Sequence, residues 1–251
     1  MQSVQQLNVK LVKGLKKFFK DSNNSKAVVG LSGGIDSALT VSLTAEAIGK
    51  GNVSCIIMPL KGVSSEKNTQ DALNYARDLG VSAFIVPVND LVAPFSKLPW
   101  KQSTTAQANL APRARAAVLY NFANSNNAVV VGTGNRTEML LGYFTKFGDG
   151  AADVFPLGGL FKSDVRELAK FRGVPSAILE KTPTAELWKG QTDEGEIGLN
   201  YTEIDQILRV LVVKGKQAAL KKGFDEEKVN RIVALMEKNR HKSEPVPVIK
   251  L

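Results

Sequence analysis

The chain has 251 residues, of which 43% are hydrophobic, and it carries a formal net charge of +9. This length suits one sizeable α/β domain, or one such domain with an appendage. The single cysteine, Cys55, excludes an internal disulfide and a zinc site built from cysteines. Since no apolar run approaches the ~18 residues of a membrane span, we expect a cytoplasmic protein that does not enter a membrane.

A positive charge of this size raises the question of a nucleic-acid partner. From Arg209 to Leu251 the chain has 11 lysine and arginine residues against 5 acidic ones, so most of the excess lies near the C-terminus. The basic side chains fall among apolar positions at helical spacing, which a solvated helix face explains. We therefore expect no nucleic-acid partner, and anionic small molecules would suit the same field.

The first 21 residues predict a helix. Leu7, Leu11, Leu15 and Phe18 repeat at helical spacing, so one face of this helix is expected to pack on the domain. The segment lacks arginine and is poor in serine, which argues against a transit peptide.

Four short, nearly continuous apolar runs then alternate with helical segments. The runs predict strands over 26–31, 52–59, 82–88 and 127–133. Helices are expected between them, over 36–48, 66–79 and about 110–124. Strands buried on both faces and joined by helices form a parallel sheet. The predicted fold is therefore an α/β, doubly wound, Rossmann-like parallel sheet, with Cys55 as a buried, unreactive thiol in its second strand.

The rest of the chain predicts long connections and three more helices. Residues 89–109 lack periodicity, residues 142–161 are rich in glycine, and residues 181–198 form a further loop. Trp100 and Trp188 fall in these connections, where we expect them to pack against apolar neighbours. The helices are expected over about 163–172, 202–214 and 225–240, the last one beginning at Asp225.

Between the first predicted strand and helix lies Ser-Gly-Gly-Ile-Asp-Ser, residues 32–37. It matches neither the Walker A motif G-x-x-x-x-G-K-[ST] nor the dinucleotide motif G-x-G-x-x-G. Its backbone amides and two hydroxyls suit a pyrophosphate, but Asp36 would repel that anion unless a divalent cation lay between them. Mg²⁺ binds through one or two carboxylates together with substrate phosphates. The motif therefore predicts a Mg–ATP site; the alternative is that Asp36 only caps the helix.

A second group follows the fourth predicted strand, with Thr133 at its tip and Glu138 five residues further on. In a doubly wound sheet, ligands bind beyond the carboxyl ends of the strands where the strand order reverses. If the first and fourth strands are neighbours, Thr133 and Glu138 reach the same crevice as Asp36, and the two carboxylates would hold one metal ion. The alternative for Glu138 is a solvated position on a helix.

Several motifs together resemble one family. Ser-Gly-Gly-x-Asp-Ser is similar to the loop of the N-type ATP pyrophosphatases, which cleave ATP between the α and β phosphates and activate a substrate as an adenylate. From about residue 10 to residue 245, the chain resembles the ammonia-dependent NAD synthetase family, whose fold is adenine nucleotide alpha hydrolase-like. The motifs that carry this resemblance are RARAAVLYNFA, VVGTGNRTEMLLGYFTKFGDGAAD, PLGGLFKSDVRELA, KTPTAEL, DEGEIG, YTEIDQIL and the late HK.

The resemblance implies the ATP-dependent amidation of deamido-NAD to NAD with ammonia, through an acyl-adenylate and with release of AMP and pyrophosphate. It implies Mg²⁺ binding by Asp36 and Glu138. The residues that it assigns to ATP are Gly30, Leu31, Ser32, Gly33, Gly34, Ile35, Asp36, Ser37, Thr133, Lys162 and Thr184. Those that it assigns to deamido-NAD are Arg113, Lys146, Asp153, His241 and Lys242.

The resemblance also implies a homodimer with the dinucleotide near the subunit interface. Residues 1–251 would form a single synthetase domain without a glutaminase domain, so a separate glutaminase could supply the ammonia. From the residues alone, His241 at a helix end is expected to be exposed. The chain departs from the family pattern at Ala108-Asn109, Ala116 and Gly134-Asn135, and we expect these departures to affect the dinucleotide side.

Two other interpretations account for part of the pattern. An RNA-modifying ATP pyrophosphatase would share the phosphate loop and use the positive charge. Its sulfur-transferring branch needs reactive cysteines, whereas this chain has only Cys55, and its lysidine-forming branch needs added RNA-binding domains. A non-catalytic nucleotide-binding module of similar fold would have no use for Asp36 and Glu138 together.

Overall fold

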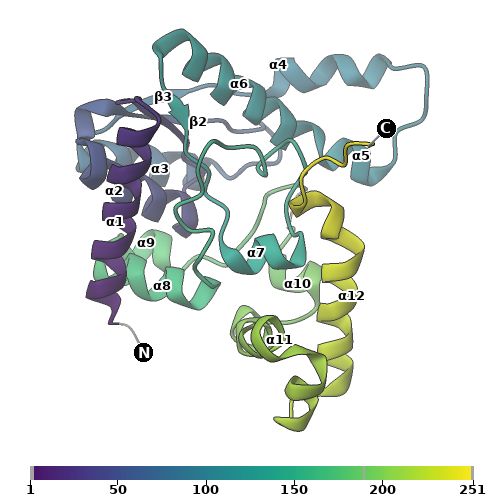
Figure 1. The fold of residues 1–251 in the computed structure, drawn as a ribbon. Coiled ribbons are helices and arrows are strands. Elements are labelled where there is room, and N and C mark those ends of the chain that lie inside the picture. Colours follow the sequence, from purple (N-terminus) through teal and green to yellow (C-terminus); the bar gives the residue numbers. More distant parts are fainter. Residues whose placement is uncertain (1–2, 189, 250–251) are drawn as a thin grey trace.

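The computed structural model describes residues 3–188 and 190–249, which build a four-stranded parallel sheet (Figure 1). Its strands are β1 (Ala27–Gly30), β2 (Val53–Ile57), β3 (Ser82–Ile85) and β4 (Val129–Val130). They lie in the order β3-β2-β1-β4, and β1 pairs with both β2 and β4. The first and fourth strands are therefore neighbours, and the strand order reverses between them.

Alternating side chains of the strands face opposite layers of helices. Val29 and Cys55 pack in the cluster that also holds residues of α1, α2, α3, α8 and α9, whereas Val28 and Val130 pack against α6. This arrangement confirms the doubly wound parallel sheet. The bounds of these helices are α1 (Val4–Asp21), α2 (Ile35–Ile48), α3 (Glu66–Leu79), α6 (Leu110–Asn126), α8 (Lys162–Phe171) and α9 (Ser176–Leu179).

The N-terminal helix α1 packs on the domain as predicted. Leu15 is buried, and Leu7, Leu11 and Phe18 are partly buried against the core of the sheet. Among the described residues, no helix has the length and apolar character that crossing a membrane requires.

Glycine ends the helix that follows β1 and the helix that follows β2, as predicted. Gly49 ends α2, and Gly80 ends α3 with a left-handed backbone conformation. A side chain costs free energy in that conformation, which glycine adopts freely. A 3₁₀ helix, η1 (Lys50–Asn52), then leads into β2.

A second apolar cluster joins the helices of the C-terminal third. It contains side chains from α7 (Arg136–Leu141), α10 (Asp193–Ile197), α11 (Tyr201–Lys221) and α12 (Glu226–Ser243). Helix α11 was predicted to end at 214, and Gly215 does leave the helical region, with φ 78° and ψ 176°, before the helix resumes. Figure 1 shows α11 and α12 side by side below the sheet.

One expectation is wrong at the edge of the sheet. Strand β3 is not buried on both faces, because Phe84 and Ile85 are 49% and 48% exposed. Trp100 and Trp188 are 61% and 43% exposed, and their packing against apolar neighbours stays a prediction. The connection over 89–109 contains short helices, namely α4 (Asn89–Val92), η2 (Ala93–Lys97) and α5 (Thr104–Ala108).

The position of Cys55 in β2 gives a test of the fold. Its side chain has no exposed surface, and burial raises the pKa of its thiol to about 12. Because the thiolate is the reactive form, we expect a thiol reagent to leave the native protein unlabelled at mildly alkaline pH and to label it in concentrated guanidinium chloride. A Lys101→Cys variant, cysteine being added at an exposed position, should label at once; rapid labelling of the native chain itself would contradict this fold.

Candidate active site

A cavity of about 760 Å³ lies at the carboxyl ends of β1 and β4. Cavities of this size commonly bind small molecules or cofactors. Its lining includes these residues predicted for ATP, metal and dinucleotide: Gly30, Leu31, Ser32, Gly34, Ile35, Asp36, Ser37, Thr133, Glu138, Lys162, Thr184 and Lys242. The structure therefore brings the loop after β1 and the group after β4 into one crevice, at the point where the strand order reverses.

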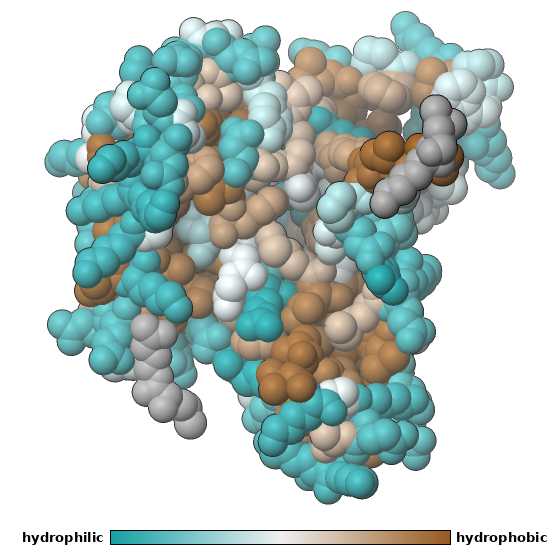
Figure 2. Space-filling model, viewed as in Figure 1, coloured by the Kyte–Doolittle hydropathy of each residue, from teal (hydrophilic) through white to brown (hydrophobic). Residues whose placement is uncertain are grey.

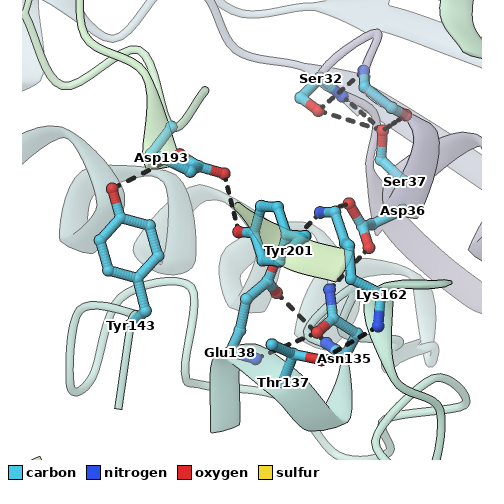
Figure 3. A network of polar contacts seen from close by, with 12 residues as sticks. Ser32, Asp36, Ser37, Asn135, Thr137, Glu138, Tyr143, Lys162, Asp193 and Tyr201 are labelled. Atoms are coloured by element: carbon cyan, nitrogen blue, oxygen red, sulfur yellow. Dashed lines mark hydrogen bonds and ion pairs between the residues drawn. The ribbon is translucent and has the colours of Figure 1, made fainter. Parts of the chain in front are cut away.

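The loop between β1 and α2 folds around its own serine hydroxyls (Figure 3). Ser37 Oγ lies 3.1 Å from Ser32 Oγ, accepts from the Ser32 backbone N–H at 3.2 Å and donates to Gly34 O at 2.9 Å. Gly34 is the N-cap of α2, and no side chain of the described residues caps this end. The first amides of α2 are thus donors for an anion, whereas the two hydroxyls bond to each other and to the Gly34 carbonyl oxygen.

Gly33 allows the loop between β1 and α2 to pack closely against α3. Its φ is +80°, and a Cβ built there would lie 2.3 Å from the backbone oxygen of Asn68. Lys181 donates to Gly33 O at 2.9 Å and pairs with Asp71 at 2.7 Å, while Glu186 accepts from Asn68 Nδ2 at 2.7 Å. The segment after α9 is therefore fastened to both the phosphate loop and α3.

The most concentrated charge in the site is a buried group of three side chains (Figure 3). Lys162 Nζ lies 2.6 Å from Asp36 Oδ2 and 3.1 Å from Glu138 Oε1, and Lys162 is only 2% exposed. Asn135 Nδ2 donates to the other oxygen of Asp36 at 2.9 Å. We call these three residues, Asp36, Glu138 and Lys162, the cation centre.

Burial and charge act in opposite directions within the cation centre. Burial alone would lower the pKa of Lys162, but the two carboxylates beside it raise that pKa above its ordinary value. Burial raises the pKa of Glu138, although the Lys162 ammonium opposes this shift. Lys162 is therefore protonated, whereas Glu138, with a pKa of about 7, holds its proton more readily than an ordinary carboxyl group.

The donor atoms of the cation centre decide whether a magnesium ion could bind there. Within the described ranges, no group of three or more histidine, cysteine or acidic side chains gathers to hold a metal. Asp36 and Glu138 nevertheless turn their oxygens toward one shared cation, which in this structure is the ammonium of Lys162. Two carboxylates with oxygen ligands from a substrate phosphate and water are a donor set that Mg²⁺ accepts. The residues present fit that ion.

Two hydrogen-bonded tyrosines lie near the cation centre, and one of them, Tyr143, lines the cavity (Figure 3). The ring of Tyr201 lies 5.0 Å from Lys162 Nζ, and its hydroxyl donates to Asp193 Oδ2 at 3.0 Å. The hydroxyl of Tyr143 donates to Glu196 Oε2 at 2.7 Å. Burial raises the pKa of both tyrosines, so they remain neutral hydrogen-bond donors.

Four of the five residues predicted for the dinucleotide lie near one another. Lys242 donates to Gly142 O at 2.7 Å, Lys146 donates to the backbone oxygen of His241 at 2.6 Å, and Arg113 Nε lies 3.4 Å from Lys146 O. His241 is exposed in the last turn of α12, as expected.

Asp153, the fifth, lies apart from these four, beside β4. Its Oδ2 accepts from the Val130 backbone N–H at 2.7 Å. Among the departures, Ala116 is buried in the cavity wall, and Asn109 accepts from Thr145 at 2.7 Å. The binding roles of all these residues stay predictions.

The structure decides both alternatives for the acidic residues. Gly34, not Asp36, is the N-cap of α2, so the capping explanation of Asp36 is wrong. The side chain of Glu138 is 18% exposed and paired, so it is not a solvated position.

Asn135 was not predicted as a residue of the cation site. From the sequence we related it to dinucleotide binding, whereas in the structure its side chain contacts Asp36. The signal was present, because Asn135 and Glu138 have capping-box spacing and do form that box.

The parallel sheet, the strand reversal and the serine–glycine loop define a Rossmann-like α/β protein with the ATP pyrophosphatase fold. Comparison with known sequences then narrows this class. The sequence model of the NAD synthase family matches residues 7–246. A curated relative, the NH(3)-dependent NAD(+) synthetase of Archaeoglobus fulgidus, is 44% identical over 230 residues, 92% of this chain and 90% of the relative. The chain belongs to the NAD synthase family and is an enzyme.

Solved structures agree with this assignment. An NMN synthetase from Francisella tularensis has a TM-score of 0.89 and 35% identity, and the match covers 99% of both chains. An NH3-dependent NAD synthetase from Campylobacter jejuni, in complex with the nitrate ion, has a TM-score of 0.85 and 29% identity over 99% of this chain and 100% of that one.

The cation centre generates a prediction for ATP binding. Asp36→Asn removes one of the two carboxylates that attract a cation, and a hydrogen bond to a charged group contributes about 1.5–3 kcal/mol. We therefore expect the dissociation constant for ATP with Mg²⁺, measured by calorimetry, to rise about tenfold or more while circular dichroism shows an intact fold. Glu46→Gln is the matched control, since Glu46 pairs with Arg172 at 2.6 Å outside the cavity lining; equal affinities for the two variants would contradict the role of Asp36.

Proposed function

We propose that this chain converts deamido-NAD to NAD with ATP and ammonia. The observation that carries this proposal is the cation centre beside a serine–glycine phosphate loop, in a chain that is 44% identical to an NH(3)-dependent NAD(+) synthetase. We also retain the single synthetase domain without a glutaminase domain, and the cytoplasmic location, as parts of this proposal. The full burial of Cys55, the only cysteine, leaves no accessible thiol of the kind that glutamine hydrolysis commonly uses.

The chemistry explains why ATP is needed. Ammonia does not displace oxide from a carboxylate at neutral pH. The nicotinate oxygen therefore attacks the α-phosphorus of ATP, the bond from that phosphorus to the bridging oxygen breaks, and pyrophosphate leaves. Ammonia then adds to the acyl carbon and loses a proton, and the bond from that carbon to the AMP oxygen breaks. Neither step requires a protein nucleophile, so positioning and electrostatics supply the catalysis.

The proposal gives each part of the cavity a task. The amides of the loop, with Ser32 and Ser37, hold the departing pyrophosphate. Asp36 and Glu138 would hold Mg²⁺, which when bound would stabilise negative charge on the phosphates. Lys162 stays protonated between the two acids and supplies a fixed positive charge. Thr133 and Thr184, which line the same cavity, are assigned to ATP.

The dinucleotide is assigned to the region around the end of α12. Arg113, Lys146, His241 and Lys242 lie near one another there and bring positive charge toward an anionic substrate. Asp153, beside β4, stays part of the proposed set through the family resemblance alone. The ammonia is taken from solution or from a separate glutaminase.

A second candidate function comes from the Francisella tularensis relative, which is an NMN synthetase. If this chain shares that activity, its acceptor would be the nicotinate mononucleotide instead of the dinucleotide. Both acceptors carry the same reacting carboxylate, so the cation centre and phosphate loop serve either. The two candidates differ in whether an adenylate half of the acceptor must be bound.

A homodimer is part of the proposal. The edge strand β3 and the following segment expose apolar side chains, and Figure 2 shows such side chains on the surface near α4. They are Phe84, Ile85, Leu91, Phe95 and Trp100, which are 41–61% exposed. An unprotected edge strand with apolar side chains is a typical place for another chain, and we assign it to a second copy of this chain.

The first experiment measures products. Purified protein with Mg–ATP, deamido-NAD and ammonium should form NAD, AMP and pyrophosphate in equal amounts, and glutamine should replace ammonium only at background level. Glutamine hydrolysis commonly uses an activated cysteine, and Cys55 is buried in β2. Glutamate formed in step with NAD would overturn the use of free ammonia.

Parallel reactions with the nicotinate mononucleotide in place of deamido-NAD separate the two candidate functions. A higher kcat/KM for the mononucleotide would favour the second candidate.

A charged substitution at β3 tests the proposed dimer interface. Phe84→Lys should shift the protein from dimer to monomer in analytical ultracentrifugation, because a buried unpaired ammonium opposes association. Phe171→Lys is the control, since Phe171 in α8 is equally exposed, at 48%, on another part of the chain. A Phe84→Lys dimer as tight as the unmodified protein would place the interface elsewhere.

A further inference from the structure

Asp205 is a buried charged residue with no task in the proposed chemistry. It lies in α11, is 2% exposed, and is absent from the lining of the described cavity. A buried carboxylate costs free energy unless partners compensate for the lost water. Its partners therefore show what the carboxylate does.

Both carboxylate oxygens of Asp205 accept hydrogen bonds from elements that carry the cation centre. Oδ1 accepts from the Thr137 hydroxyl of α7 at 2.5 Å, and Oδ2 accepts from the Ser163 backbone N–H of α8 at 2.7 Å. Thr137 Oγ1 accepts in turn from the Lys162 backbone N–H at 3.0 Å (Figure 3). The first two amides of α8, which lack partners within their own helix, are thus held by Asp205 directly or through Thr137.

The two residues that Asp205 contacts are adjacent in the sequence to members of the cation centre. Thr137 directly precedes Glu138, and Ser163 directly follows Lys162. One turn earlier on α11, on the same face as Asp205, Tyr201 places its ring 5.0 Å from Lys162 Nζ. One face of α11 therefore supports Lys162 from its backbone and from its ammonium.

We propose that Asp205 is a positioning residue that keeps Glu138 and Lys162 in register with Asp36. It joins the start of α8 to α7, so the contacts of Lys162 with the two carboxylates, at 2.6 and 3.1 Å, depend on it. Displacements of about 1 Å in such a group have large effects on catalysis. The catalytic readout rests on the proposed function, whereas the readout on ATP binding does not.

Two substitutions break this connection at different points. In Asp205→Asn, the amide has one acceptor oxygen in place of two, so either Thr137 or Ser163 keeps a buried donor without an acceptor. Thr137→Val keeps the volume and removes the hydroxyl, and Thr137→Ser retains the hydroxyl. Asp164→Asn is the matched control, because Asp164 accepts from the Phe161 backbone N–H at 3.0 Å at the same end of α8 without contacting Thr137.

The experiment measures the dissociation constant of ATP with Mg²⁺ by calorimetry, kcat and KM for deamido-NAD, and thermal stability. Asp205→Asn and Thr137→Val should weaken ATP binding about fivefold or more and lower kcat about tenfold or more, with KM for deamido-NAD within about twofold of the unmodified protein. Thr137→Ser should restore both quantities to within about twofold. Asp164→Asn should lower the melting temperature but leave ATP binding and kcat within about twofold. The double variant Asp205→Asn/Thr137→Val should be no worse than the poorer of its two single variants, because both substitutions break the same connection.

The proposal is overturned if Asp205→Asn and Thr137→Val lose stability but keep the ATP affinity and kcat of the unmodified protein, or if Asp164→Asn lowers both equally. If Asp205→Asn does not fold, the comparison of Thr137→Val with Thr137→Ser decides alone. If the unmodified protein binds ATP but forms no NAD, the proposed function fails, and the ATP affinities of the variants still decide the role of Asp205.

Discussion

The buried ammonium of Lys162 between Asp36 and Glu138 is the interaction on which the rest of the site depends. Each of the three charges comes from a different element: α2, α7 and α8. Removing three charges from water is expensive, and a buried ion pair repays that cost only with close geometry and further hydrogen bonds. The sheet supplies the first condition, because the neighbouring strands β1 and β4 direct α2 and α7 to one crevice, and Asn135 supplies part of the second.

The C-terminal helices connect the cation centre with the region assigned to the dinucleotide. Helix α11 touches Lys162 through Tyr201, while α12 approaches the end of α7 so closely that a Cβ on Gly142 would lie 2.2 Å from that of Asn239. Lys242, on the same helix, binds the carbonyl oxygens of Gly142 and Phe144. Because α11 and α12 also pack against each other, the two helices link the cation centre to the segment after α7.

The sequence predicted the elements whose signals are local. The apolar runs that became β1 and β2 and the glycines that end α2 and α3 each depend on residues a few positions apart. The capping box of Asn135 and Glu138 is equally local, but it was missed. The partners of Lys162 could not be found in this way, since Asp36 lies 126 positions away. Exposure of β3 escaped prediction for a related reason: an apolar run indicates a strand, but its neighbours in the sheet decide whether both faces are covered.

Charge balance finally relates the composition of the chain to its site. The two carboxyl groups of the cation centre do not attract a polyanionic nucleotide. Groups around them in the cavity can do so, namely the first amides of α2 and the lysines near the end of α12, Lys238 and Lys242. The net charge of +9, which first raised the question of nucleic acid, equally suits the anionic substrates of the proposed reaction.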